Sequence, residues 1–155
     1  SESYLNNAKR YDSSNTPWKN DEMLQLRTGK KGPYTEILFS LKKNDKDFYI
    51  YGINGIIKME NINDCNLKQK KIVSDISALF PKIKSKSKNI KHRGDPSGKS
   101  TISEIYFILN KNKIIPDKIA VACYDWSEKM QYYDNLRVII SSSEFRNWII
   151  NEAYN

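Results

Sequence analysis

Apolar and polar residues alternate over several short stretches of this chain, which is the pattern of half-buried β-strands. The clearest case is residues 34–42, where Ile37, Phe39 and Leu41 share one face. Similar patterns predict strands at residues 23–27, 48–51, 55–59, 102–109, 118–124 and 136–141. We therefore expect six or seven strands.

Two segments change to the period of an α-helix. In residues 70–80, Ile72 and Ile76 belong to an apolar stripe at helical spacing, and Pro81 is expected to end the helix. In residues 141–144, Ser141 and Glu144 match a capping box, with Ser141 as the cap of a closing helix. Since helices do not alternate regularly with strands, we expect a mainly β (β-rich α+β) fold with a partly closed antiparallel sheet and two or three short flanking helices.

Composition is consistent with one folded domain over residues 1–155. Its first twenty residues, 1–20, form a polar N-terminal extension. The 155 residues are enough to bury a core. Ten Tyr, five Phe and three Trp argue against disorder, which is usually poor in aromatic residues. No apolar run reaches the length needed to cross a membrane, so no membrane partner is expected.

The two cysteines, Cys65 and Cys123, lie far apart in the sequence and do not form a zinc-binding pattern. Cys123 lies in an apolar run and is predicted to be a core residue. Residues 1–15 contain no apolar stretch typical of a signal peptide. We therefore expect a reducing, cytoplasmic location, and no metal or cofactor.

Charge is concentrated in residues 82–99, KIKSKSKNIKHRGDPSGK. Seven of these eighteen residues are Lys or Arg and one, Asp95, is acidic, which gives +6 of the net charge of +8 for the whole chain. A segment of one sign with interspersed Gly, Pro and Ser is typical of a loop that follows a polyanion. Release of counterions from phosphates drives nucleic-acid binding, so we expect a nucleic acid as the partner.

A second basic loop at residues 27–33 carries three positive charges and no acid. Lysines of both loops are expected to contact phosphates, while Arg27 or Arg93 can present a guanidinium fork to guanine. Asp95 is a candidate to accept a hydrogen bond from cytosine, or alternatively a turn-forming residue before Pro96. The full set of candidate DNA-binding residues is Arg27, Thr28, Lys30, Lys31, Lys84, Lys86, Lys88, Lys91, His92, Arg93, Asp95, Ser97 and Lys99.

No convincing catalytic set is visible. The chain has one histidine, His92, so neither a Ser or Cys triad nor a histidine-based metal site can be assembled. No Asp-Xaa-Lys or Glu-Xaa-Lys triplet, the metal-binding end of many restriction nucleases, occurs. Glu36, Asp47 and Lys58 resemble the nuclease core of mismatch-repair and restriction enzymes, but Asn54 stands where a second acid is expected.

Two basic motifs resemble the arms of a known family. Thr28-Gly29 and the following basic residues precede an early strand, and Arg93-Gly94-Asp95-Pro96 precedes a long apolar strand. This arrangement is similar to the DNA-recognition effector domain of type II restriction endonucleases of the EcoRII and BfiI kind. The resemblance implies an open seven-stranded pseudobarrel that grips the major groove through two basic arms, with the nuclease domain elsewhere on the same or another chain.

The leading hypothesis is therefore sequence-specific binding of double-stranded DNA by a non-catalytic domain. One alternative is a small Mg-dependent nuclease of the restriction or toxin type, using Glu36, Asp47 and Lys58 or His92. Another is binding of single-stranded nucleic acid or RNA, with aromatic residues as stacking platforms. The candidates for that role are Tyr34, Tyr49, Tyr51 and Trp126.

Overall fold

The computed structural model describes residues 9–10, 20 and 22–153. The predicted polar extension, residues 1–20, lies outside the described residues except for positions 9, 10 and 20. The elements in chain order are β1 (Lys9–Arg10), β2 (Met23–Thr28), β3 (Glu36–Lys42), β4 (Ile50–Lys58), α1 (Ile62–Leu79), β5 (Ser85–Lys91), β6 (Thr101–Ile108), β7 (Lys118–Asp125), β8 (Asn135–Ser141) and α2 (Ser143–Asn151).

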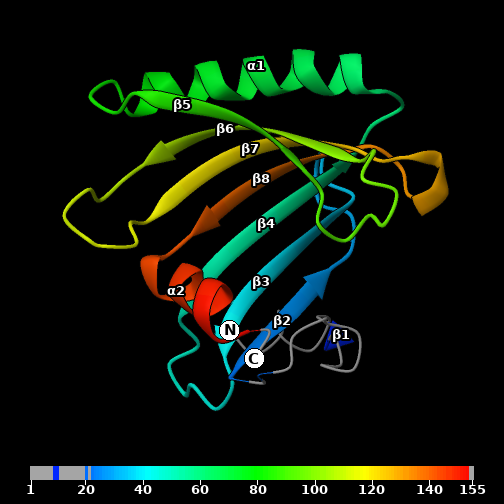
Figure 1. Cartoon of the computed structure of the whole chain (residues 1–155). Helices are drawn as coiled ribbons and strands as arrows, with labels where there is room; N and C mark the ends of the chain where they lie inside the picture. The colour runs from blue at the N-terminus through cyan, green and yellow to red at the C-terminus, as the bar shows by residue number, and fades with distance from the viewer. Residues whose placement is uncertain (1–8, 11–19, 21, 154–155) are drawn as a thin grey trace.

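The described strands form a single antiparallel sheet in the order β1-β2-β3-β4-β8-β7-β6-β5 (Figure 1). β1 has only two residues, so the sheet consists of this short strand and seven longer ones. Its edge strands, β1 and β5, do not pair with each other, so the sheet is open. The prediction of a mainly β fold with an open seven-stranded sheet is confirmed.

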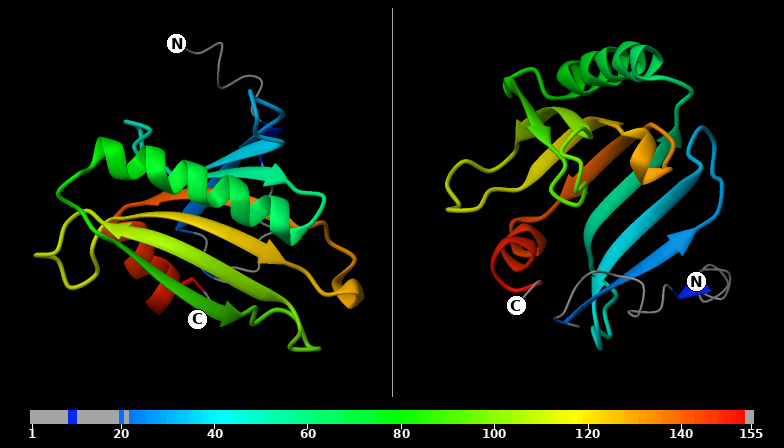
Figure 2. Two further views of the ribbon diagram at one scale, coloured as in Figure 1. Left: turned by 90° about the horizontal axis from the view of Figure 1, so that it is seen from above. Right: turned by 45° about the vertical axis from the view of Figure 1, so that its right-hand side comes forward.

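The two helices lie on opposite faces of the curved sheet (Figure 2). On one face α1 packs over β7 and β8, and Val121, Leu136 and Ile57 form the buried core with it. On the other face α2 packs near β4, with Trp148 against Met23. The open part of this second face carries the site described below.

Three predicted boundaries were wrong. The strands expected at residues 48–51 and 55–59 are one strand, β4, because its two glycines are places of close packing and not turns. A Cβ at Gly55 would lie 2.6 Å from Cε1 of Tyr34. The helix expected from residue 70 begins at Ile62, where Asn61 caps it, and has 18 residues, so it is not short. The closing helix is capped by Ser142 and not Ser141, which is the last residue of β8.

Cys65 of α1 and Cys123 of β7 form a disulfide bond that fixes the helix to the sheet. Both residues are fully buried, so Cys123 is a core residue as predicted. The expectation of a reducing environment had rested on their separation in the sequence, which says nothing about distance in the fold. Disulfides are rare in the cytosol and persist in oxidising compartments, so this bond weighs against that expectation.

Candidate nucleic-acid interface

We call residues 82–99 the basic edge. The sequence predicted a loop, but residues 85–91 form the edge strand β5, which pairs with β6 through its backbone. All seven residues of β5 are exposed. Within the described residues, no acidic side chain forms an ion pair with the exposed cations Lys82, Lys84, Lys86, Lys91, Arg93 and Lys99.

Lys88 is the exception on the basic edge. Its Nζ lies 2.9 Å from Oε2 of Glu104, which also pairs with Lys118 at 2.5 Å. Glu104 is buried, and although burial raises its pKa, the two lysines lower it below the ordinary value. Lys88 therefore ties β5 to the sheet and is not available to a phosphate without breaking this pair.

Asp95 organises the loop that follows β5. Its Oδ2 accepts hydrogen bonds from the hydroxyls of Ser100, Ser97 and Ser127, at 2.6, 2.8 and 2.9 Å, and from the Ser100 backbone N–H at 2.8 Å. Its Oδ1 accepts from the Ser97 backbone N–H at 2.8 Å. Hydrogen bonds from Ser100 and Ser97 hold the pKa of Asp95 far below its ordinary value.

This network corrects the base-reading role expected for Asp95. The residue is 5% exposed and its lone pairs are occupied within the protein, so a cytosine amino group cannot reach it. The turn-forming alternative fits the geometry. Ser97 is likewise a partner of Asp95, and the one acid of the basic edge is directed inward while its cations face solvent.

His92, a candidate DNA-binding residue, is part of an aromatic cluster. Its ring lies 4.5 Å from that of Trp126, and its Nδ1 accepts a hydrogen bond from the Gly94 N–H. Burial and the charge of Arg137 lower the pKa of His92 from its ordinary value. The ring is therefore neutral at pH 7, and it links the basic edge to Trp126.

In the second basic loop, two of the four candidate residues are turned to solvent. Lys30 and Lys31 are exposed beside a tight turn in which Lys31 and Tyr34 exchange backbone hydrogen bonds. Arg27 instead pairs with Glu36, with its Nε 2.5 Å from Oε2. The Thr28 hydroxyl donates to the Gly29 carbonyl at 3.3 Å. Arg27 can therefore read a base only if its pair with Glu36 opens.

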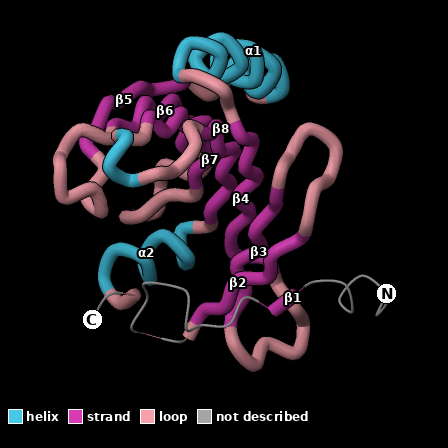
Figure 3. Tube along the Cα trace, turned by 90° about the vertical axis from the view of Figure 1, so that its right-hand side faces the viewer, coloured by secondary structure: helices cyan, strands magenta, loops and turns pink. Residues whose placement is uncertain are grey.

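The topology brings both basic loops to the same end of the sheet. The β2–β3 and β5–β6 connections both leave from this end, and Figure 3 looks directly at it. They are five strand spacings apart, or at most about 24 Å along the sheet at about 4.8 Å per spacing. This upper bound is about twice the roughly 12 Å width of the major groove of DNA.

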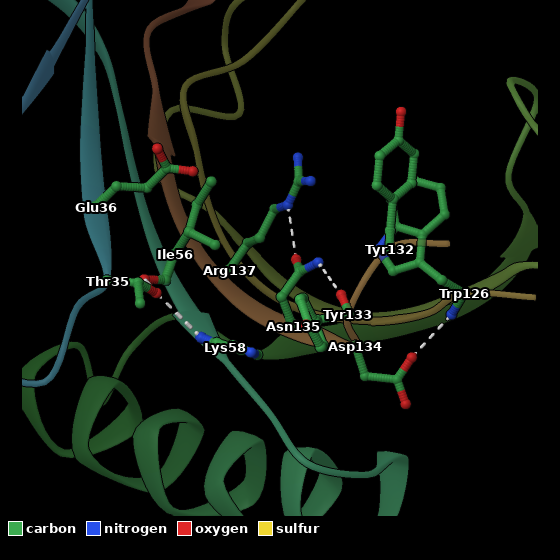
Figure 4. Close-up of a pocket in the computed structure, with 10 residues that line it drawn as sticks. All are labelled: Thr35, Glu36, Ile56, Lys58, Trp126, Tyr132, Tyr133, Asp134, Asn135 and Arg137. Atoms are coloured by element: carbon green, nitrogen blue, oxygen red, sulfur yellow. Dashed lines mark hydrogen bonds between the residues drawn. The ribbon is translucent and has the colours of Figure 1, made fainter. Parts of the chain in front are cut away.

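A pocket of about 370 Å³ lies between the two loops at this end, and Figure 4 labels the ten residues that line it. Glu36 and Ile56 form one side, and Trp126 and Tyr132 the other (Figure 4). Arg137 extends between them from β8. The pocket therefore combines flat aromatic walls with a charged group.

Internal contacts hold these side chains in place. The Arg137 Nε donates to Oδ1 of Asn135 at 2.9 Å, and its guanidinium lies 4.1 Å from the centre of the Tyr124 ring. The rings of Trp126 and Tyr132 meet edge to face at 5.0 Å. The Trp126 backbone N–H donates to Asp134, which closes the loop on itself. The β7–β8 loop thus supplies the aromatic wall of the pocket, and β3, β4 and β8 supply most of the rest.

Sequence reasoning missed most of this pocket. It named Trp126 as a stacking residue but not Tyr132, Tyr133 or Arg137. The other three aromatic candidates lie elsewhere: Tyr34 packs against the α1 core, Tyr51 against α2, and Tyr49 is in the β3–β4 loop at the opposite end of the sheet. The signal that could have found the pocket is three large aromatic residues within residues 126–133.

The nuclease alternative does not gain a site. Glu36 and Lys58 both line the pocket, but Asp47 lies in the β3–β4 loop at the opposite end of the sheet. No group of three or more His, Cys, Asp or Glu among the described residues is arranged to hold a metal ion.

Comparison with known protein families, curated proteins and solved structures found no match to this chain. The resemblance to restriction effector domains therefore remains a prediction. In the described part of the chain, no helix has the length and apolar character needed to span a membrane.

Proposed function

We propose that this protein binds double-stranded DNA in a sequence-selective manner, with its two basic loops on the phosphates either side of a groove. The observation that carries the proposal is a set of exposed cations at one end of the sheet that have no ion-pair partner among the described residues. It comprises Lys91 at the end of β5, Arg93 and Lys99 on the loop that follows, and Lys30 and Lys31 on the other loop. Backbone contacts of this kind supply affinity and fix the orientation of the protein on the duplex.

The lysines of β5 support this proposal less strongly than those of the loops. Lysine on an exposed edge strand also discourages pairing with another chain, so Lys86 has a second physical reason to be there. Lys91, the last residue of β5, shares this second reason, because it still pairs with Thr101. Arg93 and Lys99 do not, because they lie beyond the end of the β5–β6 ladder.

Base reading is assigned to Arg93, which is exposed and has no acidic partner among the described residues. Arg27 and Asp95 leave the base-reading set, since the first pairs with Glu36 and the second is buried. The resemblance of the two arms to restriction effector domains supports a recognition module, with cleavage by a nuclease domain elsewhere on the same or another chain.

A cytoplasmic location agrees with DNA as the partner, but the Cys65–Cys123 disulfide weighs against it. The bond lies on the face covered by α1, the opposite face from the pocket and α2 (Figure 2). Binding should therefore be equal in oxidised and reduced protein, provided that the reduced protein is folded.

The test is selection of bound sequences from a randomised duplex library at about 150 mM salt, where phosphate binding alone is already weakened. We expect one short motif to be enriched, and Arg93→Ala to relax a single base position at a cost of roughly 1–3 kcal/mol. Binding without enrichment, or equal competition by heparin and by duplex DNA, would contradict sequence-selective recognition.

A further inference from the structure

We propose that the pocket between the two basic loops receives the base of an unpaired nucleotide in the bound nucleic acid. This inference rests on the proposed function and adds to it a second kind of contact. It assigns a ligand to the aromatic residues of the β7–β8 loop. Phosphate binding by the two basic loops gives those aromatic residues no role.

The position of the pocket is the first argument. A nucleic acid held on both basic loops must pass over the pocket, because β4 and β8, which form its floor, lie between those loops in the sheet. The contact between His92 and Trp126, at 4.5 Å, joins the basic edge to the pocket wall. A nucleotide adjacent to a phosphate on the basic edge is therefore close to the aromatic rings.

The surface chemistry is the second argument. The side chains of Tyr132 and Tyr133 are 62% and 68% exposed. Large aromatic rings bury more apolar area than most side chains when a partner covers them, so these two rings offer a contact surface to a ligand. Every base has a flat π-face that stacks on such rings. The pocket volume of about 370 Å³ lies in the range of roughly 300–1,000 Å³ typical of small-molecule sites.

The charged groups are the third argument. Asn135 holds the Nε of Arg137, and the guanidinium also packs on Tyr124 and hydrogen-bonds to its hydroxyl. Its terminal nitrogens lie in the space between Glu36 and the aromatic wall (Figure 4). A guanidinium fork pairs with O6 and N7 of guanine. The Glu36 carboxylate lies across the pocket, and although its Oε2 pairs with Arg27, its other oxygen can accept from an N–H group on the other edge of the same base. We therefore expect guanine to bind best.

Duplexes that differ at one nucleotide test this inference. We would compare a fully paired duplex of about 20 base pairs with the same duplex carrying a single extrahelical guanosine, and with one carrying an abasic site at that position. An extrahelical base does not have to be unstacked before it enters a pocket. We expect the guanosine bulge to bind about tenfold more tightly than either of the others, the effect of one base stacked on an aromatic ring.

The variant Tyr132→Ala should remove this advantage and leave binding of the paired duplex unchanged. Trp126→Ala should have the same effect if the β7–β8 loop stays folded. If that loop unfolds, Tyr132→Ala still decides the test, because the Tyr132 side chain is mostly exposed. Tyr49→Ala is the matched control, because Tyr49 is 63% exposed but lies at the opposite end of the sheet.

Two results would overturn the inference while leaving the proposed function intact. The first is equal affinity for the guanosine bulge and the abasic bulge. The second is an advantage that survives Tyr132→Ala. Failure of the proposed function looks different: the protein would then bind none of the three duplexes, or the library selection would enrich no motif, whereas both results above compare duplexes that are bound.

Discussion

Removal of the loop cations should reduce the salt dependence of DNA binding by a calculable amount. The change is the triple substitution of Lys91, Arg93 and Lys99 by alanine, three exposed side chains for which the described residues contain no ion-pair partner. Each phosphate contact contributes about −0.9 to the slope of log K against log salt. If roughly five cations contact phosphates, the slope is about −4.5, and loss of three contacts leaves about −1.8.

The two slopes predict very different behaviour between about 50 and 200 mM salt. The affinity of the unmodified protein should fall by about 500-fold over that range, and that of the variant by about 12-fold. Fluorescence anisotropy with a labelled duplex at four salt concentrations measures both slopes. Since none of the three side chains is buried, the melting temperature of the variant should stay the same.

The matched control removes three exposed lysines far from the site: Lys46 in the β3–β4 loop, Lys71 on α1 and Lys111 in the β6–β7 loop. It changes the net charge by the same amount and should leave the slope unchanged, because long-range attraction without contact releases few counterions. The reasoning is refuted if the two triple variants reduce the slope equally, since binding would then follow net charge and not the basic loops.

Three further predictions concern the scaffold. The Cys65–Cys123 disulfide joins residues 58 apart in the sequence, so on the chain-entropy model its reduction should lower the free energy of unfolding by about 4 kcal/mol. The urea midpoint of unfolding, measured with and without reductant, tests this, and an unchanged midpoint contradicts it. Gly55→Ala should destabilise by about 1–3 kcal/mol through overpacking against Tyr34, whereas Gly29→Ala, with no atom within 4 Å of its added Cβ, should have little effect on the melting temperature. The pKa values of Asp95, Glu104 and Asp117 are all lowered in the folded state. Their ionised forms therefore stabilise the fold at pH values above the unfolded pKa of about 4, and this stabilisation is lost as the pH falls below it. The melting temperature should drop between about pH 5 and pH 2, and the drop should be smaller in Asp95→Asn.

The strands that could be predicted from the sequence are those with one face buried. β3 was located by the alternation of apolar and polar residues, and β6 and β8 by their runs of apolar, largely β-branched residues, each within two residues of its bounds. β5 has a single large apolar residue, Ile90, and both of its faces are exposed, so it leaves no alternation to detect. It is a strand because β6 offers a row of backbone hydrogen-bond partners, and that is tertiary information.

The candidate site divides in the same way. The clustering of charge was visible in the sequence, because net charge requires no knowledge of the fold. The role of Asp95 was not, since four of its hydrogen-bond donors come from Ser97 and Ser100 but one comes from Ser127, on a loop 32 residues away. The pocket was also hidden, because it needs the β7–β8 loop and the start of β3 at the same end of the sheet.

The finding that β5 is a strand changes the way in which the basic edge can bind. A mobile lysine-rich loop follows a phosphate backbone of any shape, but it loses conformational freedom on binding, and that loss opposes affinity. Here the ladder with β6 and the Lys88–Glu104 ion pair fix the spacing of Lys86 and Lys91 along the strand before any ligand arrives. The hydrogen bonds of Asp95 hold the loop that carries Arg93. Because a preformed surface favours ligands whose phosphates match its spacing, the charge of the basic edge can discriminate between nucleic-acid shapes. The order conferred by Asp95 and Glu104 is therefore the structural basis on which we expect a regular duplex to bind better than a flexible polyanion such as heparin.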